Sequence, residues 1–127
     1  MYRFALLTLP VLTLVPLVAG PAPNLTDDPP SFKADVQPLL TKYCVQCHGE
    51  MRPKAGIRFD SYDGMMKSKR KPLVVGQPDQ SVMVKSMTGK GNKPMPPKRS
   101  PQPTKEEVDL LKAWIKAGAK DDSKGEE

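Results

Sequence analysis

Apolar residues recur at helical spacing in several short stretches of the chain, and the first of these stretches follows Ser31. Ser31 has the side chain of a helix N-cap and predicts a helix from Phe32 to about Tyr43. Pro38 falls inside this helix, where its missing N–H group predicts a kink or a split into two pieces. The apolar positions that predict the buried face of the helix are Phe32, Val36, Leu39, Leu40 and Tyr43.

The last predicted helix has the clearest boundaries. Thr104 and Glu107 form a capping box, and Gly118 suits the left-handed position that follows the end of a helix. One stripe of this helix is apolar and the opposite stripe is charged, which predicts one buried and one solvated face. The apolar stripe is Val108, Leu111, Trp114 and Ile115, and the charged stripe is Lys105, Asp109, Lys112 and Lys116.

Shorter elements are expected between these two helices. Residues 56–60 are predicted to be extended, and Ser61 is predicted to cap a helix that ends near Ser68. Pro78 is expected near the start of a third helix that ends close to Met87. The pattern as a whole predicts an all-α domain of three to five short helices joined by long loops.

The N-terminal segment is typical of a secretory signal peptide. Arg3 precedes an uncharged apolar run over residues 4–18, which is short for a membrane span, and small residues follow it. We predict cleavage after Ala19, with an uncleaved N-terminal anchor as the alternative, and therefore an exported, periplasmic protein. The predicted organisation is a signal peptide over residues 1–20, a Pro-rich linker over 21–30, a folded domain over 31–121 and a charged tail over 122–127.

The composition limits what the folded domain can contain. Of the 127 residues, 38% are hydrophobic, while 15 are proline and 9 are glycine, so the chain has little material for a core. A core completed by a non-protein group fits this composition. The chain has two cysteines and one histidine, which excludes sites that need two imidazoles, such as a bis-His haem or a His-rich zinc centre.

Both cysteines and the single histidine fall in one motif, Cys44-Val45-Gln46-Cys47-His48. In an exported chain, C-x-x-C-H is typical of covalent c-type haem attachment, because the two thiols reach the two vinyl groups of one porphyrin and the imidazole reaches its iron. A disulfide in so small a loop stabilises little, a zinc site lacks further ligands, and a thioredoxin-like dithiol lacks its βαβ setting. The motif favours one haem c held by Cys44, Cys47 and His48, with the dithiol as the main alternative.

A second axial ligand has to be something other than His or Cys, because none of either remains. A methionine thioether is then the leading candidate. Met95 lies in the segment KPMPP (residues 93–97), whose prolines hold an extended loop, and this rigid presentation favours Met95 as the ligand. Met83 and Met87 are spaced as on one helix face and are explained by core packing. They remain alternatives, as does an iron with an open or water-bound position.

The chain carries a formal net charge of +6. Several basic residues flank Met95, where a haem edge would be exposed, and a cationic rim there would steer an acidic redox partner. An ordinary solvated surface is the alternative. Export and the scarcity of aromatic residues among the basic ones argue against binding of nucleic acid. The basic residues concerned are Lys67, Lys69, Arg70, Lys71, Lys85, Lys90, Lys93, Lys98 and Arg99.

Five stretches occur in a characteristic order and approximate spacing: SFKADVQPLLTKYCVQCHG, KAGIRFDSYDGMM, VVGQPDQSVMVKSM, MPP and TKEEVDLLKAWIKAGA. With them the chain resembles, over about residues 31–121, the single-haem class I type cytochrome c domain found in planctomycete and related bacterial proteins. The resemblance implies a small cytochrome c fold wrapped around one haem c. It also implies thioether bonds at Cys44 and Cys47, with His48 as the proximal and Met95 as the distal ligand.

These features predict a carrier of single electrons between redox proteins. Ligation by His and Met leaves no open position for a substrate, so we expect an electron carrier and not an enzyme. The alternative is a haem-containing docking or sensor module of a larger periplasmic assembly, in which Met95 is labile. Contact with the membrane is expected only if the N-terminal segment is retained.

Overall fold

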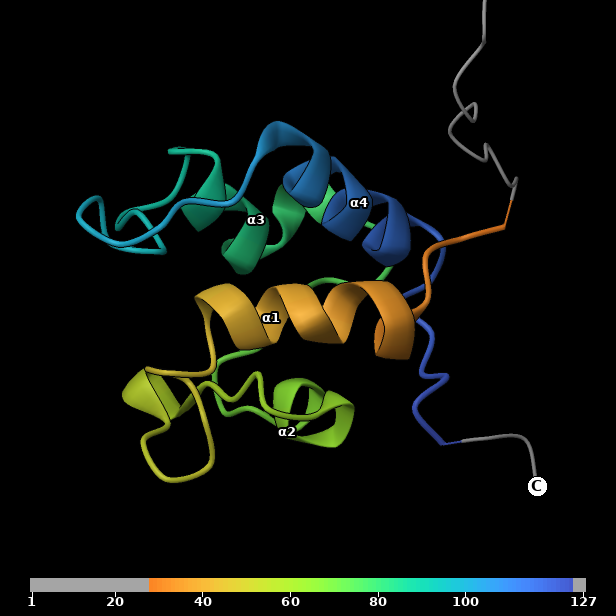
Figure 1. The fold of residues 1–127 in the computed structure, drawn as a ribbon, viewed down its shortest axis with the longest axis horizontal. Helices are drawn as coiled ribbons and strands as arrows, with labels where there is room; N and C mark the ends of the chain where they lie inside the picture. The colour runs from red at the N-terminus through yellow and green to blue at the C-terminus, as the bar shows by residue number, and fades with distance from the viewer. Residues whose placement is uncertain (1–27, 125–127) are drawn as a thin grey trace, which may run out of the picture.

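The computed structural model describes residues 28–124, so the predicted signal peptide and most of the linker lie outside the described residues. The regular elements in this range are helices, together with one isolated bridge between His48 and Pro53, which agrees with the all-α prediction (Figure 1). No helix among these residues is long and apolar enough to cross a membrane. The elements are η1 (Phe32–Val36), α1 (Gln37–Tyr43), η2 (Lys54–Gly56), α2 (Tyr62–Met66), η3 (Pro78–Gln80), α3 (Val82–Met87) and α4 (Lys105–Lys116).

The first predicted helix changes its winding just before Pro38. Ser31 Oγ accepts a hydrogen bond from the Ala34 N–H at 2.9 Å, as expected of an N-cap. The residues of η1 wind as a π-helix, in which the Gln37 N–H bonds the carbonyl of Phe32, five residues back. Pro38 lies in the first turn of α1, where it needs no intrahelical N–H. The predicted split therefore takes the form of a change from π-helix to α-helix.

The helix α4 begins and ends as predicted and supplies much of the core. Thr104 Oγ1 accepts from the Glu107 N–H at 3.2 Å, the Glu107 carboxylate accepts from the Thr104 N–H at 2.8 Å, and Gly118 has a φ of 108°. Trp114 of α4 lies against Phe32 of η1, with ring centroids 5.5 Å apart. The largest fully buried apolar side chains are Trp114, Phe32, Leu40, Met65, Leu111, Ile115, Val36 and Val84.

Two of the shorter predicted elements differ from the structure. The stretch 56–60 is not extended throughout, because Gly56 closes the 3-10 turn η2 with a φ of 70°. The helix predicted from Pro78 is interrupted at Ser81, whose buried hydroxyl accepts from the Val74 N–H at 2.9 Å and donates to the carbonyl four residues back. A side chain that bonds the local backbone competes with helix formation, so η3 and α3 are separate elements.

The helix α2 forms as predicted but ends earlier. Ser61 Oγ accepts from the Gly64 N–H at 3.0 Å, and the helix ends at Met66, two residues before the predicted end. The chain beyond α4 returns to the first helix, where the Asp122 carboxylate accepts from the Lys33 N–H at 2.8 Å. Residue 122, the first of the predicted charged tail, is thereby attached to η1.

Two long loops carry the residues predicted to bind the cofactor. One loop leads from α1 to α2 and contains the cysteine motif, and the other leads from α3 to α4 and contains Met95. In Figure 1 both loops lie on the left, the side on which α1 ends. The core that joins α1, α3 and α4 therefore places both loops at the same end of the molecule.

Candidate functional site

The cysteine motif forms tight turns directly at the end of α1. The Cys44 N–H bonds the Leu40 carbonyl at 2.8 Å and so continues the helix by one residue. The Cys44 carbonyl in turn accepts the N–H groups of Cys47 at 3.1 Å and His48 at 2.9 Å. Both cysteines are free thiols and partly buried. Local backbone bonds thus hold two thiols and one imidazole on a single short segment.

The imidazole of His48 has a defined orientation. His48 Nδ1 lies 3.1 Å from the Lys54 carbonyl oxygen, which can only accept a hydrogen bond. In the neutral imidazole Nδ1 is therefore the nitrogen that carries the proton, and Nε2 has the lone pair that a metal ion needs. The ring of Phe59 meets the His48 ring edge to face, with centroids 5.4 Å apart, and the Phe59 N–H bonds the His48 carbonyl at 2.7 Å.

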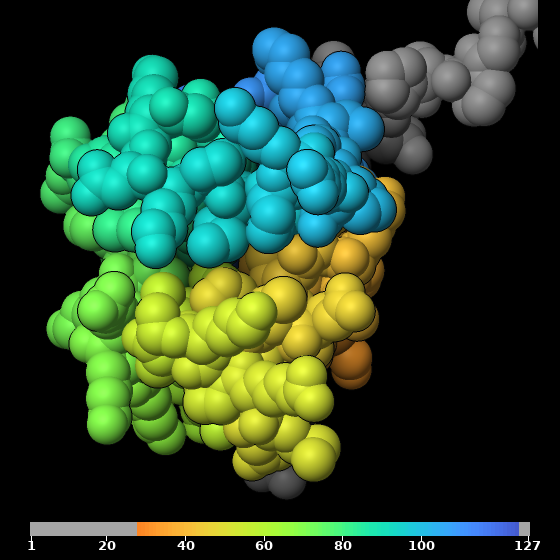
Figure 2. Space-filling model, turned by 90° about the vertical axis from the view of Figure 1, so that its left-hand side faces the viewer, coloured from red at the N-terminus to blue at the C-terminus, as the bar shows by residue number. Residues whose placement is uncertain are grey.

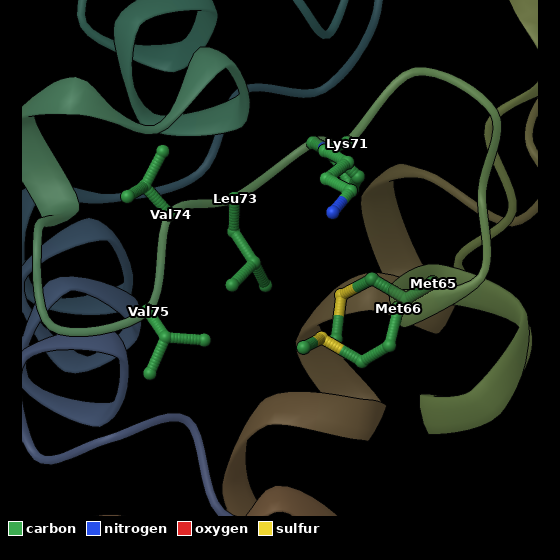
Figure 3. Close-up of a pocket in the computed structure, with 7 residues that line it drawn as sticks. Met65, Met66, Lys71, Leu73, Val74 and Val75 are labelled. Carbon is green, nitrogen blue, oxygen red and sulfur yellow. The ribbon is translucent and has the colours of Figure 1, made fainter.

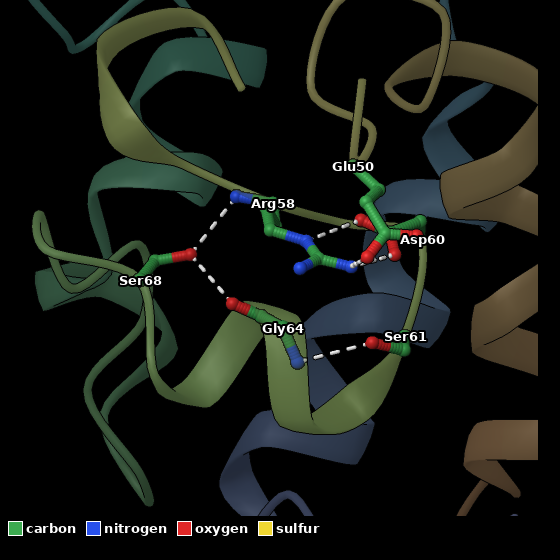
Figure 4. Close-up of polar contacts among 6 residues, drawn as sticks. All are labelled: Glu50, Arg58, Asp60, Ser61, Gly64 and Ser68. Carbon is green, nitrogen blue, oxygen red and sulfur yellow. Dashed lines mark hydrogen bonds and ion pairs between the residues drawn. The ribbon is translucent and has the colours of Figure 1, made fainter. Parts of the chain in front are cut away.

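An ion-pair network braces the segment that contains Phe59 (Figure 4). Arg58 binds the Asp60 carboxylate with two nitrogens, at 3.0 and 2.6 Å, and lies 3.6 Å from Glu50 in the loop after His48. The guanidinium lowers the pKa of Asp60 below its usual value, chiefly through these hydrogen bonds. Ser68 Oγ accepts from the Arg58 N–H at 2.9 Å, which ties the same segment to the chain just after α2. The imidazole therefore rests on a well-connected part of the structure.

The environment of Cys44 argues against a thioredoxin-like dithiol. Burial, and secondarily the nearby Cys47, raise the pKa of the Cys44 thiol to about 12. Disulfide exchange needs a thiolate, and redox-active dithiols have a lowered pKa for this reason. A thiol that stays protonated at neutral pH is a poor starting point for such exchange.

The loop that contains Met95 is held at both ends by hydrogen bonds. The Met95 N–H bonds the Ser86 carbonyl of α3 at 3.1 Å. The amide of Gln102 donates to the carbonyl groups of Pro96 at 3.3 Å, Pro97 at 2.9 Å and Ser100 at 2.9 Å. The Met95 side chain is 40% exposed and is not used as core filling.

The alternative methionines have structural roles. Met83 is 7% exposed and belongs to the hydrophobic core, and Met87 packs against that core. Met65 is fully buried on α2. Core packing thus accounts for these side chains, as the helical spacing of Met83 and Met87 predicted.

The two loops occupy one face of the molecule. In Figure 2 the chain around residues 45–60 (yellow) lies in the centre and right of the lower half of this face, and the chain around residues 90–100 (teal to cyan) lies in the upper half. The two halves meet along a seam across the middle of the view. The structure therefore brings the loop with Cys44, Cys47 and His48 and the loop with Met95 to the same side.

A separate apolar cavity of about 290 Å³ lies beside α2 (Figure 3). Met65 and Met66 line it from α2, and Leu73, Val74 and Val75 line it from the segment that leads to η3. The four predicted site residues are not among those that line this cavity. It is thus distinct from the turn of the cysteine motif.

Sequence reasoning did not identify three groups that hold the predicted ligands: the Lys54 carbonyl, the Phe59 ring and the Gln102 amide. A main-chain carbonyl is present at every residue, so no sequence signal marks the one at Lys54. Gln102 follows a Pro-rich segment, and prolines supply no N–H, so the carbonyl groups around them depend on other donors. A long amide side chain next to such a segment is the signal that could have indicated Gln102.

Comparison with known families supports the predicted resemblance. Residues 44–99 match the family model of planctomycete cytochrome C, which is consistent with a cytochrome c-type domain. The match begins at Cys44 and ends four residues beyond Met95, so it contains the four predicted site residues, Cys44, Cys47, His48 and Met95. Searches of curated proteins and of solved structures gave no match. A domain of this type implies covalently bound haem and haem-based electron transfer.

Proposed function

We propose that this protein is an exported c-type cytochrome with one haem, which carries single electrons between redox proteins and is not an enzyme. The observation that carries the proposal is the hydrogen bond between His48 Nδ1 and the Lys54 carbonyl, within a C-x-x-C-H turn that belongs to the segment matching the cytochrome family. This bond leaves Nε2 as the nitrogen available to iron.

The residues of the turn fit a covalently bound haem. Cys44 and Cys47 are not joined to each other, so each keeps a thiol for a thioether bond. His48 serves as the proximal ligand, and the Lys54 carbonyl and the Phe59 ring fix its orientation. When bound, the haem supplies an iron that accepts and returns one electron.

Met95 is the proposed distal ligand. Its loop is held by Ser86 and Gln102, and Met95 is exposed instead of packed in the core. If His48 and Met95 both bound the iron, no position would be left for a substrate, which favours electron transfer over catalysis. A thioether ligand also raises the reduction potential compared with a second imidazole.

The basic residues near these loops, all exposed except the partly buried Lys85, support an acidic redox partner. Of the nine predicted to contribute, Lys67 pairs with Asp63 at 3.5 Å, and the other eight form no ion pair within residues 28–124. Their charge is therefore available to steer a partner of opposite charge. We expect the rate of electron transfer to such a partner to fall as ionic strength rises, and a flat dependence would favour an ordinary solvated surface.

The absorption spectrum of the purified exported protein tests the proposal. We expect sharp α and β bands in the reduced state that survive denaturation and acid–acetone extraction, because the haem is bound through thioethers. In the oxidised state we expect the weak long-wavelength band of methionine-ligated haem, and Met95→Ala should abolish it while Met87→Ala keeps it. Extraction of the haem by acid–acetone, or rapid carbon monoxide binding by the reduced wild type, would contradict the proposal.

A further inference from the structure

One carboxylate, that of Glu107, connects three segments of the chain. The Tyr43 hydroxyl donates to Glu107 Oε2 at 2.7 Å, and the Lys42 ammonium donates to Oε1 at 3.1 Å. The Thr104 N–H donates to Oε2 at 2.8 Å as part of the capping box of α4. Each of these bonds has a charged acceptor, and Lys42 adds a second charge.

The partners of Glu107 lie next to the two halves of the proposed haem site. Lys42 and Tyr43 are the last two residues of α1, directly before Cys44. Thr104 is the N-cap of α4 and the end of the loop that contains Met95. The Glu107 carboxylate therefore connects the end of α1, which precedes the cysteine motif (the cysteine half), with the start of α4, which follows the Met95 loop (the methionine half).

The contacts of Glu107 differ from those of an ordinary surface carboxylate. Its side chain is 28% exposed, and the Tyr43–Glu107 bond is partly buried. The Thr104 N–H, the Tyr43 hydroxyl and Lys42 lower the pKa of Glu107, so the carboxylate is ionised at neutral pH. Asp109, two residues further along α4, is 54% exposed and pairs with Lys105 of the same helix.

We infer that Glu107 is a positioning residue for the haem ligands, an inference that rests on the proposed function. The carboxylate fixes the start of α4, and with it the end of the Met95 loop, relative to the end of α1, from which Cys44 follows. Without this connection the methionine half can move away from the cysteine half, and Met95 leaves the iron more often. The iron then binds external ligands more tightly, because binding no longer competes with a fully bound Met95.

The experiment is an imidazole titration of the oxidised, full-length holoprotein, followed by loss of the long-wavelength methionine band. For Glu107→Ala we expect an imidazole affinity about tenfold higher than that of the wild type, and for Tyr43→Phe about threefold higher. Glu107→Gln keeps the shape and part of the hydrogen bonding, so its affinity should lie between those of the wild type and Glu107→Ala. Asp109→Asn removes one negative charge from the same helix and should leave the affinity unchanged.

Thr104→Ala separates this role from simple helix capping. It weakens the start of α4 but leaves the Tyr43 and Lys42 contacts of Glu107 in place, so it should lower the melting temperature with less than a twofold change in imidazole affinity. If Thr104→Ala and Tyr43→Phe lost equal stability and also showed equal changes in imidazole affinity, the inference would be overturned. An imidazole affinity in Glu107→Ala equal to that of the wild type would also overturn the inference. If Glu107→Ala does not fold, the same result in Tyr43→Phe would overturn it.

Failure of the proposed function has a different result. A wild-type protein without covalent haem, or without the methionine band, contradicts the proposed ligand set before any variant is compared. A wild-type protein with both features, and variants with unchanged imidazole affinity, contradicts the role of Glu107 alone.

Discussion

The loop with His48 and the loop with Met95 are held in different ways. Around His48 the chain is fixed by main-chain bonds between neighbouring turns, by the ring of the buried Phe59 and by the bidentate Arg58–Asp60 pair. Around Met95 the chain is held by backbone bonds from Lys90, Gly91 and Met95 to carbonyl groups of α3 and by the amide of the exposed Gln102. Exposed hydrogen bonds contribute less than those that also exclude water, so the methionine loop is the weaker of the two.

This difference has a consequence for the proposed electron carrier. A ligand on a well-braced segment stays bound, whereas a ligand on a loosely held loop can leave the iron first when the protein is perturbed. We therefore expect changes on the His48 side to affect assembly and stability. We expect changes on the Met95 side to affect the exchange of the distal ligand.

The largest effect is expected when each ligand is removed in turn. His48→Ala removes the proposed proximal ligand from the turn that also contains the two cysteines proposed to form thioethers, so we expect at least a tenfold loss of holoprotein. Met95→Ala should keep covalent haem at nearly the wild-type yield. The yields are compared by haem absorbance per mole of purified protein, and equal losses in the two variants would mean that the loops do not differ.

A smaller effect is expected at Gln102. Gln102→Glu keeps the size of the side chain but replaces the donating amide with a carboxylate, which the three backbone carbonyl groups repel. We expect an imidazole affinity of the oxidised holoprotein about five times higher than that of the wild type. Gln80→Glu makes the same substitution at an exposed residue whose amide oxygen contacts Lys85, and it should leave the affinity unchanged. An equal affinity in both variants would show that the Met95 loop does not depend on this amide.

A substitution at Phe59 tests how the loop with His48 is held. Phe59→Leu removes the edge-to-face contact with His48 and leaves a small void, so the free energy of unfolding should fall by about 1–2 kcal/mol. The imidazole affinity should stay close to that of the wild type, because the Met95 loop is untouched. Chemical denaturation of the oxidised holoprotein measures the free energy of unfolding. A raised imidazole affinity without loss of stability would contradict the role of Phe59 in holding the loop with His48.

The smallest effect concerns pH and the Arg58–Asp60 pair. Arg58 lowers the pKa of Asp60 in the folded protein, while the unfolded chain has a pKa of about 3.9. The pair therefore stabilises the fold above this value, and its contribution is lost as the pH falls through the folded pKa. In Asp60→Asn we expect a lower melting temperature at pH 7 and a smaller further loss on acidification than in the wild type. A parallel pH dependence in the two proteins would show that the pair does not contribute.

Features that depend on neighbouring residues were predictable from the sequence. The caps at Ser31, Ser61 and Thr104 form because a short polar side chain bonds an N–H three residues further on, and the structure contains all three. The apolar stripe of α4 is largely buried, and this too was predictable, because the 3.6-residue period of a helix places these residues on one face. The interruption at Ser81 was missed because its buried hydroxyl also bonds Val74, seven residues away, in the segment before η3.

The sequence by itself determined the chemistry of the candidate site, because two thiols and one imidazole are brought together by a single turn of chain. It also favoured Met95 as the second ligand, because no other His or Cys remained and the prolines of residues 93–97 hold this methionine in an extended loop. Only the tertiary structure decided how these groups are held: the carbonyl that orients His48, the amide that holds the Met95 loop, and the carboxylate of Glu107 that reaches 64 residues back along the chain to Tyr43. The Glu107 contact forms where the end of α1 meets the start of α4, and the other two contacts form within loops, whose conformation is not encoded by residue spacing along the chain.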